Sequence, residues 1–149
     1  MARVVIVVGL PGSGKSHWVN RHRVEFDGLI APDYFKESLV PTLRFPDSRH
    51  YHELIMSLRA GKECLIADIS FCDTLRRLEA TWVVASDVPL ATVEWVFFEN
   101  NPEACRANIR GDGGGARAVE RLQHLEVLIH KYFVPTDVDP VRVWQPNHV

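Results

Sequence analysis

The segment Gly9-Leu10-Pro11-Gly12-Ser13-Gly14-Lys15-Ser16 constrains the fold of this chain more than any other feature. Its glycines allow backbone N–H groups to point inward at short range, and its lysine and serine supply a cation and a hydroxyl. A β-branched run at residues 3–8 comes directly before it, and helical spacing at residues 15–22 follows. This order of buried strand, glycine-rich loop and helix predicts a phosphate-binding loop of the Walker A type.

The composition is that of a single folded domain covering residues 1–149. A hydrophobic fraction of 46% is enough for one core, and the charged fraction of 24% argues against disorder. The sequence contains no apolar run of about 18 residues, which a membrane-spanning helix needs, and residues 1–8 are too short for a secretory signal. We therefore expect a cytoplasmic protein. The odd set of Cys64, Cys72 and Cys105 has no CxxC spacing and predicts buried free thiols.

Strand patterns and helix patterns alternate along the whole chain. Strands are expected at residues 3–8, 28–31, 64–67, 92–98 and 141–144. Helices are expected at residues 15–22, 47–58, 73–86, 101–110 and 116–133, with a short helix at 34–39. This alternation favours a three-layer α/β fold, in which helices cover both faces of a mostly parallel sheet.

The glycine-rich loop points to the binding of ATP and Mg²⁺. Gly9, Gly12 and Gly14 give the backbone around Ser13 the freedom to surround a phosphate group. The helix that starts at Lys15 directs the positive end of its dipole toward the phosphates, and the lysine ammonium reaches the β- and γ-phosphates. The hydroxyl of Ser16 is the expected ligand of Mg²⁺.

Two aspartates follow predicted strands, at the edge where the loop should lie. Asp68 ends the third strand and is the candidate metal-site carboxylate, because the carboxyl ends of parallel strands face one crevice. Its alternative role is to cap the following turn. Asp33 ends the second strand and is a candidate base for an acceptor hydroxyl. Its alternative is a turn-forming residue after Pro32, and spacing alone does not separate the two.

Two pairs of arginines flank a glycine cluster at residues 111–115. One pair consists of Arg106 and Arg110, and the other of Arg117 and Arg121, each at helical i and i+4 spacing. Arginines on a closing segment commonly stabilise a transferred phosphoryl group, so we expect an arginine-bearing lid at about residues 106–121. The alternatives are a flexible surface turn for the glycines and a solvated helix face for each arginine.

The chain resembles P-loop kinases of the group that includes polynucleotide 5′-hydroxyl kinases, along nearly its whole length. The residues that carry the resemblance are the phosphate loop followed by Trp18, the segment Pro32-Asp33-Tyr34-Phe35-Lys36, the strand Leu65-Ile66-Ala67-Asp68, Phe97-Phe98-Glu99, and Pro102-Glu103-Ala104-Cys105-Arg106-Ala107-Asn108-Ile109-Arg110. The last of these is similar to the Arg-Asn-containing helix that leads into the lid of that group.

The resemblance implies a five-stranded parallel sheet and an ATP-dependent kinase. It implies that Lys15 and Ser16 serve ATP and Mg²⁺, that Asp33 activates the acceptor hydroxyl, and that Arg110 is a lid arginine. Lys36 stands where that group often has an arginine and would contact the acceptor.

Two further function classes stay open beside a kinase. The acceptor of a kinase would be a nucleic-acid 5′ end, a nucleoside or another small metabolite, and the net charge of −2 does not favour a long nucleic-acid footprint. The second class is a nucleotide-binding switch or regulatory ATPase, in which water replaces a true acceptor. The third is an interaction module that retains only the fold, against which the intact loop argues.

Overall fold

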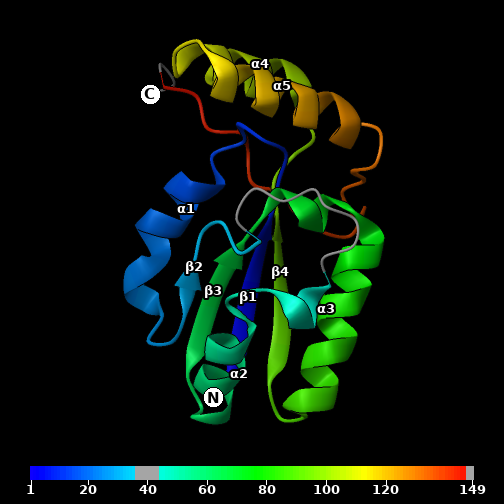
Figure 1. The fold of residues 1–149 in the computed structure, drawn as a ribbon. Helices are drawn as coiled ribbons and strands as arrows, with labels where there is room; N and C mark the ends of the chain where they lie inside the picture. The colour runs from blue at the N-terminus through cyan, green and yellow to red at the C-terminus, as the bar shows by residue number, and fades with distance from the viewer. Residues whose placement is uncertain (36–43, 147–149) are drawn as a thin grey trace.

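A parallel sheet forms the middle of the molecule (Figure 1), in a computed structural model that describes residues 1–35 and 44–146. Four strands are found in these residues, in the order β2-β3-β1-β4, and every neighbouring pair is parallel. The strands are β1 (Arg3–Val8), β2 (Ile30–Ala31), β3 (Glu63–Ala67) and β4 (Thr92–Phe97). Because all four run in one direction, their carboxyl ends meet at a single edge of the sheet.

Strand β1 lies inside the sheet because both of its faces are apolar. Val5 and Val7 are buried on one face, and Val4, Ile6 and Val8 are buried on the other. Successive side chains of a strand point to opposite faces, so a continuous β-branched run fits a strand that is covered on both sides. The predicted bounds of this strand are confirmed.

Helices cover both faces of the sheet, which makes a three-layer arrangement. Val19 of α1 packs in the cluster that contains Val5. Leu54 of α2 and Val84 of α3 belong to the opposite cluster, which contains Ile6. The helices are α1 (Lys15–His22), α2 (Tyr51–Arg59), α3 (Thr74–Asp87), α4 (Pro102–Gly111) and α5 (Ala116–Leu128), and short 3₁₀ turns form η1 (Arg23–Glu25), η2 (Phe45–Asp47) and η3 (Ile69–Cys72).

Helices α4 and α5 lie across the carboxyl end of the sheet (Figure 1). Cys105 and Ile109 of α4 and Leu125 of α5 are buried in the cluster that contains Ile6 of β1. The guanidinium of Arg106 joins the two helices through an ion pair of 2.9 Å with Glu126. The lid expected at about residues 106–121 therefore corresponds to the second half of α4, the glycine linker and the first turns of α5.

The prediction of five strands is wrong, because the last one contributes only a bridge at Val141. Val141 makes two backbone hydrogen bonds beside the end of β4, and the ladder stops there. The N–H of Val143 donates instead to a carboxylate oxygen of Glu99 at 3.1 Å. The N–H of Trp144 donates to the carbonyl of Ser13 at 3.0 Å. The final segment thus leaves the sheet and crosses to the phosphate loop.

Two helix boundaries also differ from the prediction. The second helix begins at Tyr51 rather than at residue 47, because residue 47 belongs to the 3₁₀ turn η2. The hydroxyl of Ser48 donates to the carbonyl of Phe45 in that turn at 2.8 Å. The last helix ends at Leu128 rather than at residue 133. Tyr132 turns back into the core there, and its hydroxyl donates to a backbone carbonyl just beyond β4.

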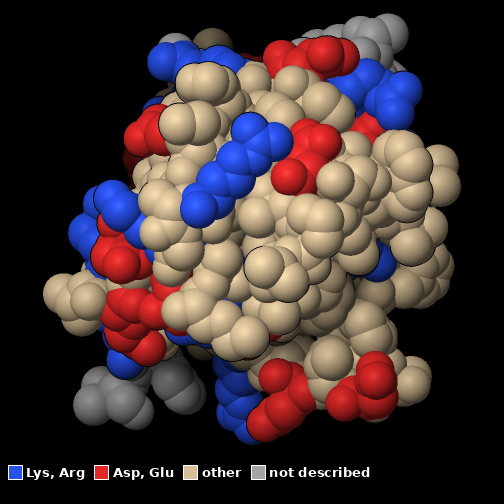
Figure 2. Space-filling model, turned by 90° about the horizontal axis from the view of Figure 1, so that it is seen from below, with Lys and Arg blue, Asp and Glu red and all other residues tan. Residues whose placement is uncertain are grey.

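Ion pairs join the strands at the opposite end of the sheet, where the strands begin. Arg3 at the start of β1 contacts the carboxylates of Glu63 on β3 and Glu94 on β4. Figure 2 views the molecule from this side and shows basic and acidic side chains scattered over a largely uncharged surface. The groups predicted to carry chemistry lie at the other edge.

The three cysteines are buried free thiols, as predicted. Burial raises the pKa of the Cys72 thiol to about 12 and that of Cys105 to about 11, so both stay protonated at neutral pH. Among the residues that the structure describes, no helix has the length and apolar character needed to cross a membrane.

Candidate functional site

The phosphate loop joins β1 to α1 and depends on glycine at two positions. Gly12 has a φ of 81° and Gly14 a φ of 103°, a left-handed conformation that side chains disfavour. A Cβ at Gly12 would lie 2.6 Å from the carbonyl oxygen of Cys105, and one at Gly14 would lie 2.6 Å from the Cβ of Trp144. The loop is therefore shaped by its own backbone and by α4 and the final segment, which press against it.

Lys15 is buried within this loop. Its Nζ donates to the carbonyl of Leu10 at 2.9 Å and lies 3.5 Å from the hydroxyl of Ser13. Burial lowers the pKa of the Lys15 ammonium from its ordinary value, and the negative charge of Asp68 works in the opposite direction. An anionic group beside a buried ammonium offsets the cost of burying its charge.

Asp68 lies at the carboxyl end of β3 and caps the turn that follows it, which is one of the two roles that the sequence left open. Its carboxylate accepts backbone N–H bonds of 2.8 Å from Ser70 and from Phe35, and the first of these caps η3. Burial raises the pKa of Asp68 to about 6, although the two N–H bonds oppose the shift and the Asp33 carboxylate adds to it. The same carboxylate also lines a cavity at this end of the sheet.

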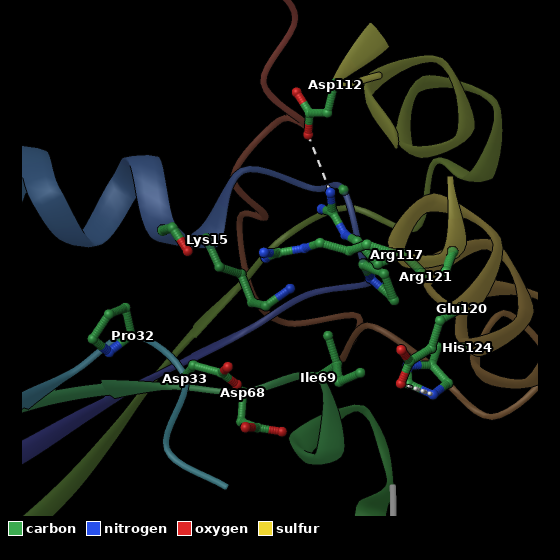
Figure 3. A pocket seen from close by; sticks show the side chains of 14 residues that line it. Lys15, Pro32, Asp33, Asp68, Ile69, Asp112, Arg117, Glu120, Arg121 and His124 are labelled. Atoms are coloured by element: carbon green, nitrogen blue, oxygen red, sulfur yellow. Dashed lines mark hydrogen bonds and ion pairs between the residues drawn. The ribbon is translucent and has the colours of Figure 1, made fainter. Parts of the chain in front are cut away.

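That cavity has a volume of about 670 Å³ and opens beside the phosphate loop. It brings Lys15 and Ser16 together with Asp33 and Asp68. Figure 3 shows the side chains of Lys15, Asp33 and Asp68 around this space. The lining residues are Pro11, Gly12, Lys15, Ser16, Pro32, Asp33, Asp68, Ile69, Asp112, Ala116, Arg117, Glu120, Arg121 and His124. Four segments that are separated in the sequence thus converge on one space.

Three other loop residues predicted from the sequence do not line the cavity. Gly9, Ser13 and Gly14 belong to the same loop, and Ser13 is fully buried. Lys36, predicted to contact the acceptor, lies outside the described residues, as does most of the helix expected at 34–39.

The two predicted arginine pairs are placed differently. Arg117 and Arg121 line the cavity, and Figure 3 shows both side chains extending from α5 into the space that the Lys15 ammonium occupies. Arg121 also forms an ion pair of 3.1 Å with Asp112. Arg106 is engaged with α5 and Arg110 is exposed on α4, and neither lines the cavity.

Two further residues on α5 face the cavity and were not singled out in the sequence. Glu120 and His124 form an i, i+4 pair, with Nε2 of the histidine 3.9 Å from a carboxylate oxygen of the glutamate. Their spacing from Arg117 and Arg121 places all four on one helix face. Taking the residues three positions after Arg117 and after Arg121 on the same helix face would have identified both.

The donor set at the loop fits Mg²⁺ bound together with a nucleotide. Ser16 offers a hydroxyl and Asp68 a carboxylate, and both line the cavity. The described residues contain no group of three or more His, Cys, Asp and Glu side chains that would hold a metal alone. Mg²⁺ is commonly bound by one or two protein oxygens, substrate phosphates and water, so this sparse set is suitable.

The glycine-rich loop lies between a buried parallel strand and a helix and encloses a buried lysine, and a carboxylate follows the adjacent strand. This arrangement is that of a nucleotide-binding protein of the P-loop class. A model of the AAA domain family matches residues 4–124 of this chain. The chain therefore belongs to the AAA domain family, which is related to P-loop NTPases and includes kinases.

The chain is also similar to a protein of Acanthamoeba polyphaga mimivirus, the uncharacterized protein R277. The two are 24% identical over 137 residues, which cover 90% of this chain and 88% of the viral protein. The similarity therefore extends far beyond the phosphate loop.

Proposed function

We propose that this protein is an ATP-dependent phosphotransferase that moves the γ-phosphoryl group of ATP to a hydroxyl acceptor. The observation that carries the proposal is the meeting of Lys15, Ser16, Asp33 and Asp68 in one cavity beside the phosphate loop. Phosphoryl transfer needs a cradle for the phosphates, a metal site and a group that receives the proton of the acceptor. These residue types, in this arrangement, offer all three.

The nucleotide side of the proposed site consists of the phosphate loop and the start of α1. The loop N–H groups and the Lys15 ammonium bind the β- and γ-phosphates. Ser16 and Asp68 would hold Mg²⁺, which neutralises charge on the phosphate oxygens when bound.

Asp33 is the proposed base on the acceptor side. The turn that carries it is fixed to the end of β3, because the N–H of Tyr34 donates to the carbonyl of Ala67 at 2.9 Å and the N–H of Phe35 donates to Asp68. The side chain of Asp33 is exposed at the cavity, within reach of an entering ligand. Its carboxylate would accept the proton that the acceptor hydroxyl loses as its oxygen attacks the γ-phosphorus.

Arg117 and Arg121 are the proposed partners of the charge that develops on the transferred group. Both extend from α5 into the cavity, opposite Asp33 and Asp68 (Figure 3). The lid role of Arg110 requires the end of α4 and its linker to move relative to the phosphate loop. A nucleotide role of Arg106 requires its side chain to leave Glu126. Lys36 completes the proposed acceptor contacts.

The proposed acceptors are a nucleic-acid 5′ end, in keeping with the resemblance to polynucleotide kinases, or a small hydroxylated metabolite. A transfer assay with ATP labelled at the γ-phosphate tests the proposal, using 5′-hydroxyl oligonucleotides, nucleosides, sugars and small polyols as acceptors. A Lys15→Met protein purified in parallel controls for contaminating kinases. We expect one class of labelled product that the variant does not form. Release of labelled phosphate without any labelled acceptor would instead indicate a regulatory ATPase.

A further inference from the structure

The layout of the strands sets the direction in which a bound nucleotide must extend. Asp33 follows β2 and Asp68 follows β3, and both of these strands lie on one side of β1. In phosphoryl transfer, the attacking and leaving oxygens are roughly in line across the phosphorus. The leaving nucleoside diphosphate therefore points away from Asp33, toward the β4 side of the phosphate loop.

The final segment of the chain lies on that side of the loop. It bridges to the chain beside the end of β4 at Val141 and then crosses over to the loop. Trp144 is fixed there by its backbone: its N–H donates to the carbonyl of Ser13 at 3.0 Å, and its carbonyl accepts from the side-chain amide of Asn108. Its Cβ lies against Gly14. The position of this residue relative to the loop is thus set without help from its ring.

The indole ring of Trp144 is left partly open to solvent, at 39% exposure. Its ring contact is with the imidazole of His17 in the first turn of α1, with centroids 4.8 Å apart and planes inclined by 38°. His17 directly follows Ser16, so the pair stands beside the exit of the phosphate loop. A large aromatic surface held rigidly in this place suits a flat, apolar ligand group.

We propose that Trp144, braced by His17, stacks against the purine base of the bound nucleotide. The inference rests on the proposed nucleotide-binding function and adds to it the subsite that holds the base. Stacking uses the face of the base, which all purines share, and reads none of its hydrogen-bonding edge. The site should therefore favour nucleotides over bare polyphosphates and distinguish adenine poorly from guanine.

Binding of ADP, GDP and pyrophosphate to a Trp144→Ala variant tests the proposal. Alanine keeps the backbone bonds and the Cβ, so only the ring is lost. We expect the dissociation constants for ADP and GDP to rise about tenfold or more, as for loss of one stacked base, and that for pyrophosphate to stay within about twofold. A Trp144→Phe variant should recover most of the ADP affinity. Trp82→Ala, which removes an indole that is 70% exposed on α3, should change none of the three constants.

The same measurements separate the possible failures. If Trp144→Ala weakens the binding of ADP and of pyrophosphate equally, the ring supports the loop and does not contact the base. If ADP binding is unchanged, the base lies elsewhere. Either result overturns the proposal and leaves the phosphate site intact. If the unmodified protein binds neither ligand, the nucleotide function fails and this inference fails with it. Tryptophan emission gives an independent check: ADP, unlike pyrophosphate, should quench it, and Trp144→Phe should remove the quenching.

Discussion

The side-chain amide of Asn108 donates a hydrogen bond of 2.9 Å to the carbonyl of Gly12, and so ties α4 directly to the phosphate loop. The same amide also donates to the carbonyl of Trp144. Asn108 is buried at the point where the loop, α4 and the final segment meet. The middle of α4 is therefore part of the loop's support, which limits any lid motion to the chain beyond Ile109.

Replacing Asn108 by alanine should weaken phosphate binding as well as the fold. It would leave the two carbonyls without this donor, which typically costs about 1–3 kcal/mol for a buried group. Asn101→Ala is a matched control, because it removes the side chain that caps α4 at a distance from the loop, at a cost of about 1 kcal/mol. We expect both variants to melt earlier and only Asn108→Ala to bind pyrophosphate more weakly. Equal pyrophosphate affinities below the melting temperatures would contradict the supporting role of Asn108.

Replacing Lys15 by methionine should abolish nucleotide binding and raise the melting temperature at neutral pH. Methionine fills similar space and removes a buried charge, and the carbonyl of Leu10 keeps its bond from the N–H of Ser13. Each kcal/mol gained would raise the melting temperature of a chain this size by about 2–4 °C. Calorimetry and titration with ADP give the two readouts, and a variant that retains ADP affinity would remove the loop from the proposed mechanism.

The stability gain from Lys15→Met should shrink as the pH rises. Burial lowers the pKa of Lys15 below its ordinary 10.5, so the folded protein binds fewer protons than the unfolded chain between the lowered value and 10.5. In that window the stability of the unmodified protein rises with pH, and below it the cost of the buried charge is complete. A difference in stability that stays constant up to pH 10.5 would show that charge is not its cause.

The sequence predicted the local units of this fold and missed a contact that only tertiary structure creates. The β-branched run and glycine-rich loop defined β1 and α1 with the observed bounds, because strand, loop and helix are specified by adjacent residues. The predicted last strand does not form, because the N–H groups of Val143 and Trp144 donate to Glu99 and Ser13 instead of to a neighbouring strand. The apolar pattern of that segment could not predict hydrogen bonds to residues as distant in the sequence as Glu99 and Ser13.

The candidate site was predictable in its residue types and less so in its geometry. Asp68 was located because it ends a buried strand, and its position in the cavity follows from the parallel sheet. The arginines of α4 and α5 share the same spacing, so spacing alone could not tell which pair faces the cavity. That choice depends on how the two helices pack, which places Arg121 inside and leaves Arg110 exposed.

Arg121→Ala should slow phosphoryl transfer more than Arg110→Ala does. Arg121 extends into the cavity, where it can exchange Asp112 for a phosphate oxygen, and loss of one such charged donor commonly costs about 10²-fold or more in kcat. ADP affinity should fall much less, because the charge on the transferred group develops mainly in the transition state. Steady-state rates and ADP titrations on both variants decide the matter. A larger loss in Arg110→Ala would assign the lid role to α4 instead.

Asp68→Asn should remove the contribution of Mg²⁺ to ADP binding while sparing most of the fold. The amide offers one acceptor oxygen and one NH₂ group, so it can satisfy only one of the N–H groups of Phe35 and Ser70. Loss of the other bond destabilises the fold, whereas removal of a buried charge stabilises it, and we expect a net change of only a few degrees in melting temperature. ADP titrations with Mg²⁺ and with EDTA provide the test. If Mg²⁺ strengthens ADP binding as much as before, Asp68 does not serve the metal.

Asp33→Asn should bind ATP normally and lose transfer to the acceptor. The neighbours of Asp33 hold the turn in place through their backbone N–H groups, at 2.9 Å for Tyr34 and 2.8 Å for Phe35, and both of their rings are buried. An asparagine therefore keeps the position and shape of the side chain, but it cannot take a proton. Removal of a general base typically costs about 10²- to 10⁴-fold in rate.

The comparison that decides the role of Asp33 measures acceptor phosphorylation and background ATP hydrolysis in one preparation, together with ATP affinity. Asp27→Asn is a matched control, because it neutralises a turn carboxylate that accepts the backbone N–H of Glu63, at the opposite edge of the sheet. We expect Asp33→Asn alone to lose transfer, while hydrolysis by water persists, since water needs no positioned acceptor contact at this turn. If transfer, hydrolysis and affinity all match the unmodified protein, Asp33 is a turn residue, and the base of the reaction must be sought among the other carboxylates of the cavity.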